Sequence, residues 1–106
     1  MTIVEFLYAR LDEDERAAHA ASPATGGPGR ARADVAAKRR IVNEYVRAYQ
    51  AGVNAIGGRG APASDDSWGA LHAWRKALEH LASAYAGHPD FDHTWAVQQG
   101  QGVPRR

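Results

Sequence analysis

Cysteine is absent from the 106 residues of this chain. That absence excludes a disulfide framework, a thiol nucleophile and a cysteine-ligated zinc or iron–sulfur site. The chain also lacks the apolar run of roughly 18–20 residues that a membrane span needs, and charged residues appear early, at Glu5 and Arg10. We therefore expect neither a transmembrane helix nor a signal peptide, and a reducing, intracellular compartment fits the composition.

A large excess of one charge is missing too. Lys and Arg number 13 and Asp and Glu number 12, which gives a formal net charge of +1, and the sequence pI is about 8.2. Nucleic-acid-binding domains usually have a pI above about 9. With 44% apolar residues, the chain is too apolar to be disordered, and its length allows one domain.

Alternating strand patterns are also missing, so we predict an all-α fold. Glycine- and proline-rich stretches at residues 22–29 and 57–62 separate three periodic blocks. The predicted architecture is a three-helix bundle-like domain over residues 1–97, with a short C-terminal segment packed back on it and a flexible tail over residues 98–106. The helices are expected at about residues 2–21, 34–56 and 66–86, and the short turn or helix at 89–96.

Apolar side chains recur at helical spacing in each block. The first helix is expected to open with a capping box formed by Thr2 and Glu5, and the second with Asp34 as its N-cap. The stripes expected to face the core are Ile3, Val4, Leu7, Tyr8, Leu11 and Ala18; Ile41, Val42, Tyr45, Val46, Tyr49, Val53 and Ile56; and Leu71, Trp74, Leu78, Leu81, Ala82 and Tyr85.

Four aromatic residues lie outside these stripes. Phe6 falls well away from the first arc, and Trp68 lies near the start of the third helix. Phe91 and Trp95 follow the third helix and can fold back onto the bundle. We take all four as the candidate interface with a protein partner or a second copy, because leftover apolar side chains on a small domain are the natural material for one.

One charged pair falls on the core-facing arcs. If the first two helices are antiparallel neighbours, Asp14 lies beside Lys38, and we predict a structural ion pair between them, or between Asp14 and Arg39 instead. The alternative is that Lys38 extends its stem along the surface. A partly exposed pair contributes only about 0–1 kcal/mol and mainly sets the register.

Residues that could carry chemistry are few. The acidic run at residues 12–15 is interpreted as a solvated helix end. His88, Asp90 and His93 surround a turn and are the candidate metal ligands. For His88 we favour a different role, closing the C-terminus of the third helix, where it can bind exposed carbonyls. No phosphate loop or nucleophile elbow is present in the sequence. We therefore expect no cofactor and no enzyme activity.

A basic edge on the second helix keeps nucleic-acid binding open as an alternative. Arg39, Arg40 and Arg47 are the candidate contacts, and Arg40 and Arg47 share a helix face.

Eight short segments, spread along the chain, form a recognisable series: MTIVEFL (1–7), ARL (9–11), EDE (13–15), AKRRIV (37–42), LA (81–82), YA (85–86), HPDF (88–91) and Trp95. In this order they resemble a family of small uncharacterised proteins from actinobacteria and their phages. The resemblance suggests an actinobacterium or its phage as the source, and we expect a cytoplasmic protein, in the host cytoplasm if a phage encodes it. The resemblance implies no activity, because none is established for the family.

The sequence thus favours a small, non-catalytic helical interaction or adaptor protein that binds another protein or itself. A nucleic-acid-binding accessory protein is the alternative, followed by a small hydrolase-like or metal-binding helical protein. An interaction protein requires an exposed apolar patch of several hundred Å². A nucleic-acid-binding protein requires a DNA affinity that falls steeply with salt, and a hydrolase-like or metal-binding protein requires a pocket lined by carboxylates and histidines.

Overall fold

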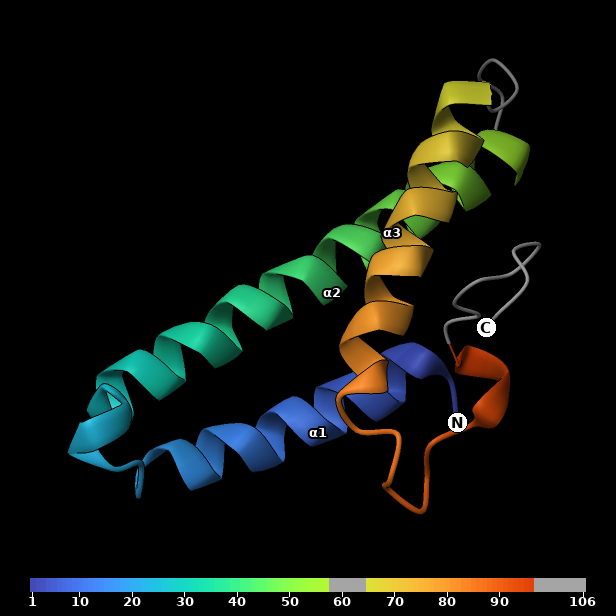
Figure 1. Ribbon diagram of the computed structural model, residues 1–106. Helices are drawn as coiled ribbons and strands as arrows, with labels where there is room; N and C mark the ends of the chain where they lie inside the picture. The colour runs from blue at the N-terminus through green and yellow to red at the C-terminus, as the bar shows by residue number, and fades with distance from the viewer. Residues whose placement is uncertain (58–64, 97–106) are drawn as a thin grey trace, which may run out of the picture.

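The computed structural model describes residues 1–57 and 65–96, and within them it has helices and no strand, which confirms the all-α prediction. In chain order the elements are α1 (Ile3–Ala18), η1 (Pro23–Thr25), α2 (Gly27–Gly57), α3 (Asp65–Ser83) and η2 (His93–Trp95), as Figure 1 shows. The predicted tail at residues 98–106 lies outside the described residues. Of the described helices, none combines the length and the apolar character needed to cross a membrane.

The capping box at the start of α1 is confirmed. The Thr2 backbone N–H donates to Glu5 Oε1 at 2.7 Å, and the Glu5 N–H donates to Thr2 Oγ1 at 3.1 Å. Hydrogen bonding from the Thr2 backbone, and then from its side chain, lowers the pKa of the Glu5 carboxyl. Two of the unpaired amides at the helix start are satisfied in this way, so α1 begins at Ile3.

α2 begins at Gly27, well before the predicted start near residue 34. Proline at the start of a helix costs no hydrogen bond, because the amide it lacks would be unpaired there. The chain reverses just before Pro28 through Gly26 and Gly27, whose φ angles are +98° and +74°, a region that favours glycine. Asp34 is consequently not an N-cap but an interior residue of α2.

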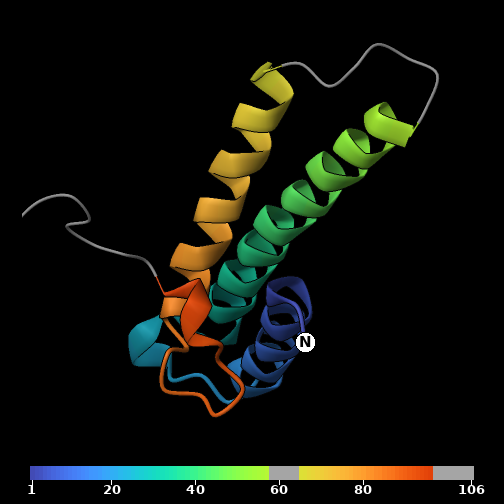
Figure 2. The same cartoon turned by 90° about the vertical axis from the view of Figure 1, so that its right-hand side faces the viewer.

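The first two α-helices differ in length. α1 has 16 residues and α2 has 31, or roughly 24 Å and 46 Å at 1.5 Å per residue. α2 packs against both α1 and α3. Figures 1 and 2 show α2 and α3 continuing together past α1. The molecule therefore has a closed end, where all three helices and η2 meet, and an open end, where α2 and α3 extend without α1.

The core lies at the closed end. Its buried members are Ile3, Phe6, Leu7, Leu11, Val35, Val42, Leu78, Ala82, Phe91 and Trp95. The last two come from the segment around η2, so the predicted packing of a short C-terminal segment back onto the bundle is confirmed. Phe6 is the centre of this aromatic packing, with ring centroids 6.1 Å from Phe91 and 5.1 Å from Trp95.

This core corrects the predicted partner interface at three of its four residues. Phe6, Phe91 and Trp95 are 0%, 7% and 5% exposed, so none of them can meet a partner while the fold is intact. The arc of α1 places Phe6 away from α2, but the C-terminal segment covers that second side of the helix. Helical periodicity reports one stripe per helix and carries no information about a segment that returns from the far end of the chain.

Candidate functional site

Three large apolar side chains remain exposed beyond the closed end. Tyr49 and Val53 of α2 are 49% and 45% exposed, and Trp68 of α3 is 44% exposed. Tyr49 and Val53 belong to the α2 stripe that was predicted to face the core. The stripe continues to the end of α2, but α1 is too short to cover it there.

Two adjoining hollows mark this surface. The first has a volume of about 360 Å³ and lies where the three helices diverge; it is lined by Thr2, Ile3, Val4, Tyr45, Val46, Tyr49, Gln50 and Arg75. The second, about 300 Å³, is lined by Tyr45, Tyr49, Trp68, Leu71, His72 and Arg75. They share Tyr45, Tyr49 and Arg75, so they form one groove between α2 and α3. We refer to the lining contributed by these two helices as the open face.

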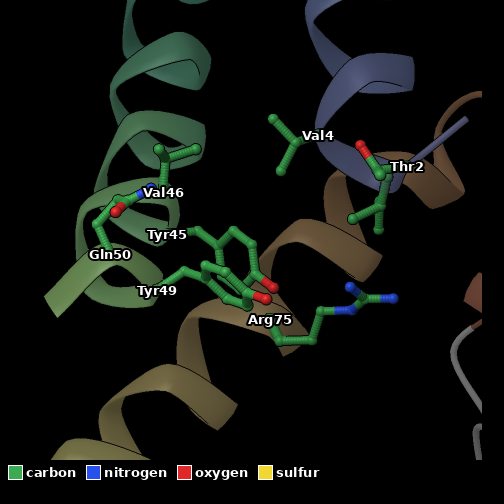
Figure 3. Close-up of a pocket in the computed structure, with 8 residues that line it drawn as sticks. Thr2, Val4, Tyr45, Val46, Tyr49, Gln50 and Arg75 are labelled. Carbon is green, nitrogen blue, oxygen red and sulfur yellow. The ribbon is translucent and has the colours of Figure 1, made fainter. Parts of the chain in front are cut away.

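Aromatic rings and a guanidinium meet in the middle of this groove. Tyr45 and Tyr49 stand one helical turn apart on α2, with ring centroids separated by 6.2 Å. Figure 3 shows both rings directed toward Arg75 of α3, with Thr2 and Val4 of α1 on the far side of the hollow. Tyrosine, tryptophan and arginine are the residue types that dominate the binding energy of protein interfaces.

Arg75 is the charged residue of the groove. Its Nε donates to Glu79 Oε2 at 3.3 Å, and Glu79 also lies 3.5 Å from Lys76 Nζ. The two terminal nitrogens of Arg75 have no hydrogen-bonding partner in the part of the chain that the structure describes. Among the described residues that line the two hollows there is no carboxylate. The groove therefore offers guanidinium donors to an acceptor from outside the chain.

A buried arginine links α1 to the segment after α3 at the closed end. Arg10 is 7% exposed, and its Nη2 donates to Glu13 Oε2 at 3.2 Å. Its guanidinium carbon lies 5.3 Å from the centre of the Phe6 ring, and its Nη1 contacts the His88 ring, with Nδ1 at 2.8 Å. This contact joins α1 to the segment after α3.

The same contact revises the prediction for His88. Its ring meets Arg10 of α1, and its Nδ1 also accepts the Asp90 backbone N–H at 3.0 Å, so the ring does not close the carbonyls of α3. His88, Asp90 and His93 were the candidate metal ligands. Within residues 1–57 and 65–96, no group of three or more His, Asp or Glu side chains is placed to hold a metal ion.

The predicted ion pair of Asp14 is corrected as well. Lys38 Nζ lies 2.9 Å from Asp34 Oδ2, one turn earlier on α2, and Asp14 Oδ2 accepts from the Tyr85 hydroxyl at 2.5 Å. Burial raises the pKa of Tyr85, and the hydrogen bond to Asp14 raises it further. The nearby intrahelical partner of Lys38 became available because α2 starts before Asp34.

Arg39 does bind the acidic run of α1, but not through Asp14. Its Nη2 lies 2.5 Å from Asp12 Oδ1, and its Nη1 donates to Glu15. The bonds to Glu15 and then Asp12 raise the pKa of Arg39. Of the other two candidate nucleic-acid contacts, Arg47 lies 3.5 Å from Glu44 Oε2, and Arg40 is exposed.

The open face also contains residues that the sequence analysis missed. Trp68 was a candidate, but Arg75 was not considered. The signal is present in the sequence: Trp68, Leu71, His72 and Arg75 follow the spacing i, i+3, i+4, i+7 and so share one face of α3. That face is rotated from the buried stripe through Leu78 and carries its own aromatic and cationic anchors.

Comparisons with known proteins place the chain in a family without adding an activity. A model of a family of unknown function (DUF6221) matches residues 1–97, and the chain therefore belongs to that family. No curated protein and no solved structure matches the chain.

Proposed function

We propose that this member of a family of unknown function is a non-catalytic helical interaction protein that binds another protein through the open face. The observation that carries the proposal is the groove between α2 and α3, where Tyr49 and Trp68 are about half exposed around the guanidinium of Arg75. Exposed apolar surface gathered around aromatic anchors is typical of a site that a partner covers.

The architecture supports the same assignment of roles. The closed end provides the stability, since the core residues of all three helices meet there. The open end contributes less to that core, and the described helices leave Tyr49 and Val53 of its apolar stripe exposed. A surface that costs solubility without adding to the core is explained when binding buries it.

The non-catalytic part of the proposal rests on the lining of the groove. Nucleophilic catalysis needs an activated nucleophile beside its base, and the base is in turn oriented by a third group. The described lining supplies one guanidinium, one imidazole and two phenols, and it contains no carboxylate that could orient the imidazole. A binding role needs these groups only as hydrogen-bonding and packing partners.

The cellular setting belongs to the proposal too. The segments MTIVEFL and HPDF resemble proteins of actinobacteria and their phages, and the absence of cysteine fits a reducing compartment. We place the protein in the cytoplasm of such a cell, where its partner is expected.

Photo-crosslinking in cells tests this function. A benzophenone amino acid replaces Tyr49 on the open face or, as the control, the exposed Arg40 on another part of α2. We expect a discrete crosslinked protein band from position 49 and none from position 40. Crosslinking from neither position, together with DNA affinity that falls steeply with salt and needs Arg40 and Arg47, would replace this proposal with the nucleic-acid reading.

A further inference from the structure

The groove on the open face also restricts the chemistry of its occupant. Taking the proposed function as its basis, we infer that the occupant is an amphipathic helix of a different protein, which places an Asp or Glu side chain on Arg75. Three features of the described residues lead to this: the backbone of the groove walls, the charge of their lining, and the result of pairing the face with itself.

The backbone of the walls favours a helical occupant. α2 and α3 use their own N–H and C=O groups in helical hydrogen bonds, and the described residues contain no strand edge to which an extended peptide could add. An extended segment would therefore bury backbone groups without partners, which is costly. A helix satisfies its own backbone and presents apolar anchors at i, i+3/i+4 and i+7, as helix-in-groove recognition requires.

The positive charge of the lining favours an occupant that carries an acidic side chain. The terminal nitrogens of Arg75 are free of partners among the described residues, and its side chain is 39% exposed. Covering that guanidinium with an apolar surface would strip its water without replacing the hydrogen bonds. A carboxylate can accept two N–H groups of the guanidinium side by side, and this geometry is strong and directional. Figure 3 shows the guanidinium beside the tyrosine rings, with Thr2 and Val4 across the hollow, and we place the carboxylate of the occupant in that hollow.

Pairing the face with a second copy does not meet this need. A two-fold interface brings the same patch of both chains together. Each copy would then add a second Arg75 and no described lining carboxylate, so both guanidinium groups would be covered without an acid from the facing groove. Charge complementarity therefore selects a partner whose apolar helix carries a negative side chain.

A charge-swap selection tests the inference. A displayed library of amphipathic helical peptides, about five turns or 18 residues long, is selected on the full chain and, separately, on Arg75→Glu. Lys76→Glu is the matched control, because it reverses the neighbouring charge outside the two hollows. Only peptides that lose binding to a Tyr49→Ala/Trp68→Ala variant are retained, and circular dichroism confirms that every variant is helical.

The expected result is an acidic residue enriched at one register position of the peptides selected on the full chain. These peptides should bind Arg75→Glu at least about tenfold more weakly, with little change on Lys76→Glu. Exchanging the enriched acid for Lys should restore binding to Arg75→Glu.

Three other results would contradict the acidic occupant, the foreign partner or the open face itself. Retained peptides without an enriched acid, or with unchanged affinity for Arg75→Glu, contradict the acidic occupant and leave the interaction role intact. A dimer in sedimentation that dissociates in the Tyr49→Ala/Trp68→Ala variant shows that the occupant is a second copy. If no peptide depends on Tyr49 and Trp68, the open face is not a binding surface and the proposed function fails as well.

Discussion

The two ends of this molecule use similar side chains for different purposes. At the closed end, Phe6 and Trp95 are buried within one small chain, because α1, α3 and η2 surround them. At the open end, Tyr49 and Trp68 remain about half exposed, because α1 begins at Ile3 and its first turn lines the hollow beside Tyr49 without covering these side chains. The difference shows that the length of a neighbouring helix, and not the apolar character of a stripe, decides whether the stripe becomes core or surface.

The largest expected contrast is between one aromatic residue at each end. Replacing Phe6 by Ala removes the ring at the centre of the core and should lower the free energy of unfolding by about 3–5 kcal/mol. Trp68→Ala should lower it by less than about 1 kcal/mol, as is usual away from a core. Urea unfolding followed by circular dichroism measures both. Equal losses would show that the open end is part of the core.

The second contrast concerns two arginines. Arg10→Ala removes the contacts with His88 and Glu13 and the cation over Phe6, and should cost about 1–3 kcal/mol of unfolding free energy. Arg47→Ala, at a side chain that is 73% exposed, should cost close to nothing. Amide hydrogen exchange adds a local test, since the segment around residues 88–95 should exchange faster only in Arg10→Ala. Unchanged exchange in that variant would mean that Arg10 does not hold the segment.

Removing one hydroxyl is expected to have a smaller effect. Tyr85→Phe loses the hydrogen bond to Asp14 and should cost about 1 kcal/mol at neutral pH. The pKa of Tyr85 is higher in the folded chain than the ordinary value of about 10, so its contribution is complete below about pH 10 and is lost as the pH rises above it. Stability should therefore fall less steeply above pH 10 in Tyr85→Phe than in the unaltered chain. Tyr49→Phe, on the open face, is the control, and identical alkaline profiles for the Tyr85→Phe variant and the unaltered chain would contradict the assignment.

The smallest effect is expected at the surface between α1 and α2. Arg39→Gln removes the pairs with Asp12 and Glu15, whose side chains are 58% and 46% exposed. Such pairs contribute about 0–1 kcal/mol, and the difference between Arg39→Gln and the unaltered chain should shrink in high salt. A loss of several kcal/mol that salt does not reduce would show that Arg39 is a core residue in energetic terms.

The parts of the fold that local patterns encode could be predicted. The capping box of Thr2 and Glu5 and the burial of Leu7, Leu11 and Leu78 follow from spacing alone. The start of α2 could not, because the glycines of the preceding stretch and Pro28 were read as a break, whereas proline in a first turn is compatible with a helix.

The contacts between distant segments were harder to predict. Asp14 was correctly expected to make a contact with another element, but the donor is Tyr85, from the turn after α3. Phe6 was correctly recognised as lying outside the main arc of α1, but its cover comes from η2. In both cases the answer depends on where the end of the chain returns, and no local pattern records that.

The candidate site was predicted only at Trp68. Tyr45 was assigned to the core and does pack against it while also lining the groove. Tyr49 was assigned to the core as well, because it continues the stripe of α2, and a stripe does not reveal how far its neighbour extends. Arg75 was missed because it does not belong to the buried stripe of α3. It lies on a second face of the helix, which also carries Trp68 and His72.

The most direct measurement of the central claim uses the tryptophans of the chain, which number three. Their indole N–H groups give separate signals in a ¹H–¹⁵N NMR spectrum, one from the open face and one from the core at Trp95. We predict that adding an acid-bearing helical peptide from the charge-swap selection shifts the Trp68 signal and leaves Trp95 in place. A peptide that binds while Trp68 stays in place, or while Trp95 shifts instead, would contradict the assignment of the open face as the binding surface.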